Sequence, residues 1–156
     1  MSETLHTPDS ENAPSPALPR RLMALVYDTF LVLPVIMLAF VLAMGTAALV
    51  EGGEPVQPLN PWLAQGLILL CLVGFFSAFW TKSGQTLGMQ AWRVKLVALP
   101  GKRLTLARCA LRCLGALLSA ACLGLGYLWC LIDRRGRYWH DYLSGTALVL
   151  VPKRKK

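Results

Sequence analysis

The sequence predicts an all-α membrane protein with two transmembrane helices, a third apolar segment and a small cytoplasmic β-ribbon. Hydrophobic residues make up 55% of the chain and charged residues only 15%, whereas soluble domains carry about 25% charged residues. The apolar residues are also gathered in blocks, because residues 29–50 and 55–81 contain no charge. Such blocks are typical of membrane spans and not of a globular core.

Both ends of the chain are expected to lie outside the membrane domain. Residues 1–18 contain prolines and acids but few large apolar side chains, which favours a disordered tail. They do not form a signal peptide, because no basic region is followed by an apolar one. The membrane domain is predicted over residues 19–151, and a basic tail follows over residues 152–156.

The first span is predicted to begin near Arg20 or Arg21 and to run to Val50. Asp28 is the one charge inside its apolar part, and ionisable groups within a bilayer are costly. Arg21 and Asp28 fall on nearly the same helix face but about 10 Å apart along the axis. We therefore expect Asp28 to interact with another segment.

The second span is predicted from Trp62 to Trp80, with a tryptophan at each membrane interface. The loop before it is rich in glycine and proline, as turns are. A basic region follows over residues 81–103, in which residues 93–98 alternate in part and predict a short strand.

The third apolar segment runs from Leu104 to Ile132, and Gly124 and Gly126 weaken a helix within it. A single crossing would leave a strongly basic C-terminus outside, against the preference of Lys and Arg for the cytoplasm. The strand-like runs 93–98 and 146–151 can also pair only on one side of the membrane. We therefore favour a re-entrant segment or helix hairpin over a single span, with a cytoplasmic N-terminus.

Three stretches have residue types and spacings characteristic of one family. They are RRLMALVYD at 20–28, SGQTLGMQAWRVKLV at 83–97 and DRRGRYWHDYLSGT at 133–146. In this order they resemble the RDD family of small bacterial membrane proteins, which is named for one arginine and two aspartates. The resemblance covers residues 19–151 and identifies these three as Arg21, Asp28 and Asp141.

The resemblance also identifies a loop motif after the second span, made of Gly84, Gln85, Thr86, Leu87 and Gly88. Met89 departs from the family, which often has a lysine there, and this puts a phosphate or lipid role of the position in doubt. The family implies a multi-pass protein of the bacterial inner membrane. Transport of some ligand has been proposed for the family, and certain members are linked to cation/proton exchange.

Asp28 has two interpretations. It is either a cation or proton site within the membrane, or one half of a structural ion pair with Arg108 or Arg112. Arg21 is either an anchor that extends to the membrane surface or a clamp for an acidic group such as Asp141.

The remaining charges favour structural roles. Arg108 and Arg112 need a carboxylate partner or the phosphates of anionic lipids on the cytoplasmic face. Asp133, His140 and Asp141 have weak metal-site spacing and are better explained as capping or salt-bridging residues of a turn.

Several function classes receive no support. The basic residues are spread between apolar segments, which argues against nucleic-acid binding. The five cysteines include no CxxC pair, and no nucleophile has a matched base, so we expect neither an enzyme nor a cofactor or metal. The leading prediction is a transport or cation/proton exchange component that works as a homo-oligomer or with a membrane-protein partner. The alternative is an accessory or scaffold protein whose buried charges are structural and lipid-binding.

Overall fold

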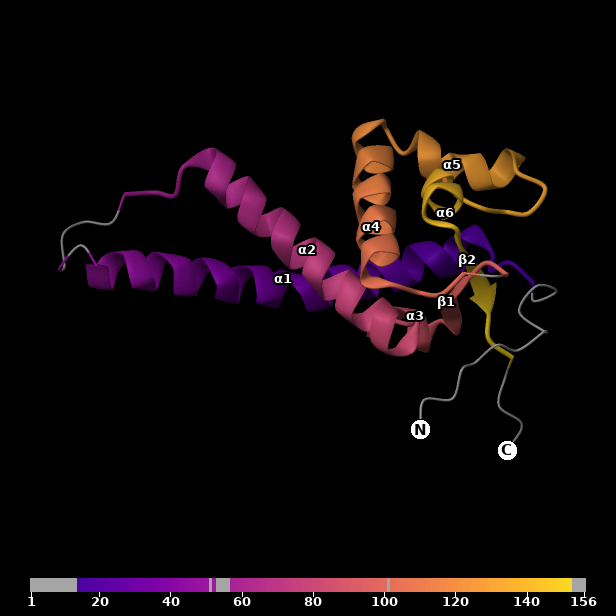
Figure 1. Ribbon diagram of the computed structural model, residues 1–156, viewed down its shortest axis with the longest axis horizontal. Coiled ribbons are helices and arrows are strands. Elements are labelled where there is room, and N and C mark those ends of the chain that lie inside the picture. The colour runs from indigo at the N-terminus through magenta and orange to yellow at the C-terminus, as the bar shows by residue number, and fades with distance from the viewer. Residues whose placement is uncertain (1–13, 51, 53–56, 101, 153–156) are drawn as a thin grey trace.

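The computed structural model describes residues 14–50, 52, 57–100 and 102–152 (Figure 1). The chain is mostly helical, with two or three apolar helices able to span a membrane and one sheet of two strands. Two long helices, α1 and α2, diverge from the folded end of the molecule, where the shorter elements gather. Most of the two predicted tails, residues 1–13 and 153–156, lies outside the described residues.

The helix α1 spans Leu18–Val50 and continues through Pro34. Its 33 residues correspond to about 50 Å, which exceeds a hydrocarbon core of about 30 Å. Residues 14–17, which were predicted to belong to the tail, contact the folded end, since the Leu150 N–H donates to the Pro14 carbonyl at 3.0 Å. Ordered backbone therefore precedes the first span.

The helix α2 spans Pro61–Ser83, in the place predicted for the second span. Asn60 caps its start by accepting a hydrogen bond from the Trp62 N–H at 2.9 Å, and Pro61 occupies the first turn, where no amide donor is needed. Gly84 ends the helix in the left-handed conformation, with φ of 71°. Trp62 is 80% exposed, but Trp80 is only 8% exposed, so the predicted interface role of Trp80 is wrong.

The third apolar segment is broken near Gly124, as the glycines at 124 and 126 predicted. Helix α4 spans Leu106–Ala121 and helix α5 spans Leu125–Ile132, and their axes differ by 97°. Leu123 and Gly124 have positive φ values of 56° and 77°, which redirects the chain between the two helices.

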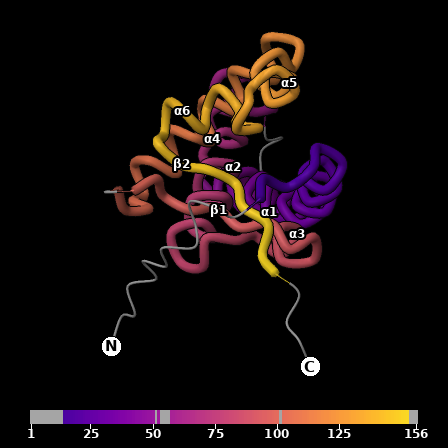
Figure 2. The backbone as a smooth tube through the Cα atoms, turned by 90° about the vertical axis from the view of Figure 1, so that its right-hand side faces the viewer, coloured from indigo at the N-terminus to yellow at the C-terminus, as the bar shows by residue number. Residues whose placement is uncertain are grey.

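The predicted ribbon is present. Strand β1 (Val94–Ala98) pairs antiparallel with strand β2 (Thr146–Leu150), with Leu96 opposite Leu148. The short helices α3 (Leu87–Ala91) and α6 (Trp139–Ser144) flank the ribbon at the same end. Figure 2 views this end directly and shows α3 beside the end of α1 and α6 beside α4.

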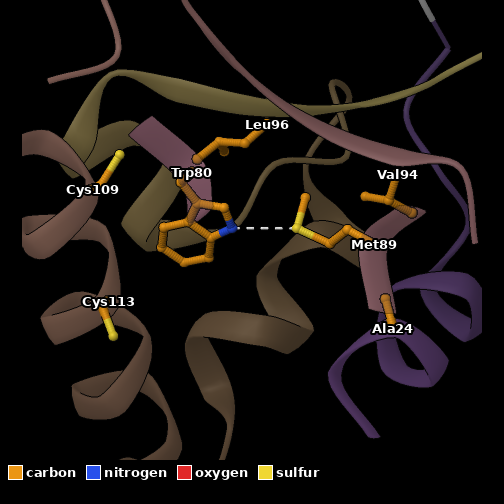
Figure 3. Close-up of a cluster of buried hydrophobic side chains, with 7 residues drawn as sticks. All are labelled: Ala24, Trp80, Met89, Val94, Leu96, Cys109 and Cys113. Carbon is orange, nitrogen blue, oxygen red and sulfur yellow. Dashed lines mark hydrogen bonds between the residues drawn. The ribbon is translucent and has the colours of Figure 1, made fainter. Parts of the chain in front are cut away.

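The buried core lies at this folded end and not between the outer halves of α1 and α2. Its members come from α1, α2, α3, β1 and α4: Ala24, Trp80, Met89, Val94, Leu96, Cys109 and Cys113 (Figure 3). Trp80 donates its indole N–H to the Met89 sulfur at 3.3 Å. The outer parts of α1 remain apolar and exposed, as at Val41 and Leu42, which is typical of a helix surface that faces lipid or another membrane helix.

Candidate functional site: two buried aspartates and the arginine of the first helix

Asp28 lies on α1 and is 2% exposed. Its Oδ1 accepts a hydrogen bond from the Gly88 N–H at 2.9 Å, and its Oδ2 accepts one from the Thr86 hydroxyl. Thr86 is also the N-cap of α3, because its hydroxyl accepts from the Met89 N–H at 3.2 Å. The carboxylate of α1 is therefore bound to the start of α3.

The expectation that Asp28 pairs with Arg108 or Arg112 is wrong. Its partners lie in the loop motif that follows α2, which brings neutral donors and not a guanidinium. Among the described residues, no basic side chain lies within ion-pair distance of Asp28. The main feature of this site is a buried carboxylate that accepts hydrogen bonds from two neutral groups, the Thr86 hydroxyl and the Gly88 N–H.

Gly88 is required by this contact. A Cβ on Gly88 would lie 2.4 Å from the Ala24 carbonyl oxygen and 2.8 Å from Asp28 Oδ1, both shorter than any van der Waals contact. Glycine is the residue that lets two backbones approach this closely. The glycine of the motif therefore serves the approach of α3 to α1.

The rest of the loop motif joins α2 to the ribbon. The Gly84 carbonyl accepts a hydrogen bond from the Leu96 N–H at 2.8 Å, and a Cβ on Gly84 would lie 2.8 Å from the Leu96 carbonyl oxygen. The Gln85 side chain donates to the Val94 carbonyl at 2.7 Å. These contacts hold β1 next to the residues that bind Asp28, namely Thr86 and Gly88.

Asp141 has a different environment. It forms a buried salt bridge with Arg112, and its Oδ2 accepts a hydrogen bond from the Tyr138 N–H at 2.9 Å. Arg112 also donates to the Thr146 hydroxyl at 3.0 Å and lies over the Trp80 ring, 5.4 Å from its centroid. The Arg112 and Asp141 side chains are 4% and 1% exposed, so α4 and α6 are joined by a charge pair shielded from solvent.

Arg21 pairs with neither aspartate. Its guanidinium donates to the Pro16 carbonyl at 2.8 Å, to the Gly136 carbonyl at 2.7 Å and to the Ser15 hydroxyl. It lies over the Tyr138 ring, 4.6 Å from the centroid, and is 7% exposed. The prediction that Arg21 is an anchor extending to the membrane surface is therefore wrong, because the side chain is buried. The predicted contact with Asp141 is indirect: Arg21 lies over the Tyr138 ring, and the Tyr138 N–H donates to Asp141.

The other predicted residues lie around this cluster. Asp133 accepts hydrogen bonds from the Arg137 N–H at 2.8 Å and the Tyr142 hydroxyl at 2.9 Å, which is the turn role expected for it. Arg108 is half-buried, with a guanidinium nitrogen that has no hydrogen-bond partner. Across the described ranges, no group of three His, Cys, Asp or Glu side chains could hold a metal ion.

His140 is buried between aromatic rings. It is 3% exposed and its ring centroid lies 5.2 Å from that of Tyr127 and 5.0 Å from that of Tyr138. Burial, with the Arg112 charge as a second cause, lowers the pKa of His140 to about 3. The ring is therefore neutral at ordinary pH and contributes no positive charge.

Two aromatic residues that were not predicted to belong to the site connect its parts. Trp80 lies between Arg112 and Met89, and Tyr138 lies between Asp141 and Arg21. The site is therefore a closed series of contacts: Asp28 of α1 contacts α3, α3 contacts α2, α2 contacts α4, α4 contacts α6, and Tyr138 at the start of α6 contacts Arg21 of α1. Tyr138 lies within the stretch 133–146 that resembles the family, so the sequence offered a signal for it. Trp80 lies at the end of an apolar span, where tryptophan is typical of the membrane interface, so its position offered no signal for its role in the site.

The sequence profile of the RDD family matches residues 15–145, a range that includes Arg21, Asp28 and Asp141. Neither a curated protein nor a solved structure matches the chain.

Proposed function

The chain belongs to the RDD family, and from this premise we propose that it is a multi-pass protein of the bacterial inner membrane. We propose further that it works in cation/proton exchange or related ion-coupled transport, with Asp28 as the ionisable site. The observation that carries the proposal is the buried Asp28 carboxyl, which has hydrogen-bond donors but no basic partner among the described residues.

Two hydrogen bonds do not replace a counter-charge. Hydrogen bonds to charged groups contribute about 1.5–3 kcal/mol each, while an ionised carboxylate removed from water without a partner costs far more. A bound proton or a bound cation compensates the remainder. A carboxyl group that exchanges one for the other is what coupled transport requires.

The two aspartates support this assignment by their contrast. Asp141 already has a counter-charge in Arg112 and caps α6 as well, so it is better suited to holding the fold. Within the described part of the chain, the donors to Asp28 are all neutral. We therefore assign the exchangeable proton to Asp28 and a positioning role to Asp141.

The accessory or scaffold function remains the second candidate, and one observation favours it. Both oxygens of Asp28 already accept hydrogen bonds that join α1 to α3. In that case the buried charges hold the helices together, and transport is performed by another protein.

The contacts at the folded end support a cytoplasmic ribbon and a third segment that returns to the side it entered from. Strand β1 pairs with β2, the Pro14 carbonyl binds the Leu150 N–H, and Arg21 binds the Gly136 carbonyl. They support our proposal that the segment before α1 and strand β2 lie on the same side of the membrane as the loop after α2. Because Lys and Arg accumulate on the cytoplasmic side of membranes, we propose that this side is the cytoplasm.

Fusions at Lys156 test this topology. A fluorescent protein fused there is expected to fluoresce and alkaline phosphatase is expected to be inactive. A phosphatase-active, non-fluorescent C-terminus would reject the returning segment in favour of a single crossing.

A homo-oligomer or a membrane-protein partner is part of the proposal. The spanning elements are few for a transport path, and the outer parts of α1 and α2 expose apolar side chains such as Met37 and Leu70. Additional helices at these faces would complete a path through the bilayer. Cross-linking in native membranes tests this, with a monomer free of any partner as the contrary result.

Everted membrane vesicles test exchange directly. Asp28→Asn keeps an acceptor for the Gly88 N–H but removes the titrating group, so exchange is expected to stop while the protein accumulates normally. Asp133→Asn is the matched control, because it makes the same change at a turn outside the two long helices, and exchange is expected to persist.

Three results would count against the proposal in different ways. Loss of accumulation in Asp28→Asn favours the scaffold function. Undiminished exchange in this variant removes Asp28 as the site. No exchange by the unaltered protein rejects transport for this chain.

A further inference from the structure

A cavity of about 480 Å³ lies against the outer face of the ribbon. Val94 and Leu96 point to the core. Because side chains alternate along a strand, Val97 and its partner Ala147 occupy the opposite face. Val97, Ala147 and Val149 line the cavity, which therefore has an apolar floor.

Two arginines and one serine form the polar part of the wall. Arg135 and Arg137 come from the loop between α5 and α6, and Ser15 comes from the segment before α1. The loop is held in place, because the Gly136 carbonyl accepts hydrogen bonds from Arg21 at 2.7 Å and from the Ser15 hydroxyl at 3.3 Å. The cavity is thus built from three separate parts of the chain that contact one another.

Among the described residues, no carboxylate forms an ion pair with the arginines of this wall, and the Arg137 charge acts on Asp133 only at longer range. In the part of the chain that the structure describes, neither Arg135 nor Arg137 has a carboxylate within 4.0 Å. Asp141 is bound by Arg112, and Asp133 faces the Arg137 backbone N–H and the Tyr142 hydroxyl. The Arg137 guanidinium lies 5.8 Å from the Tyr142 ring centroid, and such a contact with a ring face engages no N–H group in a hydrogen bond.

We propose that this cavity binds a phosphate-bearing anion. Guanidinium groups form paired, charge-assisted hydrogen bonds with phosphate oxygens, and two of them on one wall match one phosphate group. The apolar floor suits the carbon part of an amphiphile. The phosphate belongs either to the headgroup of an anionic phospholipid or to a soluble phosphate compound.

The proposed site does not depend on transport through Asp28. None of the residues that line the cavity is bonded to Asp28. Met89, where a lysine would offer another phosphate contact, is buried in the core on the other side of the ribbon. Arg135 and Arg137 therefore supply the anion-binding groups.

The test uses the full-length protein in lipid nanodiscs. Thermal unfolding is measured in phosphatidylcholine discs, in discs of graded phosphatidylglycerol content, and in phosphatidylcholine discs with added inorganic phosphate. A ligand that binds the folded state raises the unfolding temperature in a saturable way. Saturation by phosphatidylglycerol alone identifies a lipid headgroup, and saturation by inorganic phosphate identifies a soluble source.

Two double variants separate a site from general attraction. Arg135→Gln with Arg137→Gln is expected to weaken binding at least about tenfold, a loss of about 1.4 kcal/mol. Arg103→Gln with Arg134→Gln removes the same charge from exposed positions outside the cavity, and is expected to change affinity less than about twofold. Equal losses in both double variants, or no saturable effect in the unaltered protein, would overturn the proposal.

A third variant keeps the charge and fills the space. Ala147→Met extends the floor into the cavity, and is expected to reduce phosphate or lipid binding while the protein stays folded and monodisperse. Full binding by a folded Ala147→Met protein would contradict a site inside the cavity.

Discussion

Asp28 on α1 accepts a hydrogen bond at 2.9 Å from the backbone N–H of Gly88, the second residue of α3. The contact exists because Gly88 has no Cβ to collide with the Ala24 carbonyl. It links the family's first aspartate to the family's loop motif.

Gly88→Ala is expected to destabilise the protein by about 1–3 kcal/mol, because the added methyl group overpacks the contact between α1 and α3. Thermal unfolding in detergent measures the effect. Gly74→Ala on α2 is the matched control, since a Cβ added at Gly74 would meet no atom within 4 Å. The control is expected to be neutral or stabilising by up to about 1 kcal/mol, because alanine favours a helix more than glycine does. Equal behaviour of the two variants would contradict the close approach.

Thr86→Val is expected to lower stability by about 1–3 kcal/mol, because Asp28 loses a donor and the Met89 N–H loses its cap. Thr86→Ser keeps the hydroxyl and is expected to stay within about 1 kcal/mol of the unaltered protein. Unfolding experiments on both variants give the comparison. A serine variant as unstable as the valine variant would show that the methyl group and not the hydroxyl matters.

Arg112→Met is expected to destabilise the protein by about 3–5 kcal/mol, because it leaves the Asp141 carboxylate buried without a counter-charge. Arg112→Met combined with Asp141→Asn removes both charges and is expected to recover part of the loss. A double-mutant cycle on unfolding free energies measures the coupling. Additive effects of the two changes would mean that the pair does not interact energetically.

His140 is expected to make stability fall as the pH is lowered. Its pKa is about 3 in the folded protein and 6.5 ordinarily, so between these values the unfolded chain binds the additional proton. The free energy of unfolding therefore rises with pH across this window, by at most about 1.4 kcal/mol per pH unit from this one group. Above pH 6.5 the contribution of His140 is fully present, and it no longer changes with pH.

The replacement His140→Phe keeps the aromatic contacts with Tyr127 and Tyr138 but cannot bind a proton. Unfolding free energies of both proteins, measured from pH 4 to pH 7, are expected to differ in slope. Parallel curves would show that His140 is accessible to protons in the folded state.

Much of the architecture follows from local sequence features. The two long helices come from uninterrupted apolar blocks, and the break between α4 and α5 falls at Gly124, whose positive φ a glycine tolerates. The ribbon was predicted from short alternating runs and is present at 94–98 and 146–150. Membership of the RDD family was also predicted from motif order, and the family match confirms it.

The partners of the charged residues could not be predicted in the same way. Asp28 contacts Thr86 and Gly88, which are 58 and 60 positions away, and Arg21 contacts Gly136, 115 positions away. Charge alone suggested Arg108 or Arg112 for Asp28, because opposite charges attract at any separation. A hydroxyl and a backbone N–H give no comparable signal in a sequence.

The sequence by itself predicted the two apolar spans, the break in the third apolar segment and the two strands of the ribbon, because hydropathy, alternation and glycine conformation act over a few neighbouring residues. Only the tertiary structure decided that Asp141 is paired with Arg112, whereas Asp28 accepts hydrogen bonds from the neutral groups of Thr86 and Gly88. The physical reason is that ion pairs and hydrogen bonds form within about 4 Å. Which groups come that close depends on how α1, α3, α4 and α6 pack together.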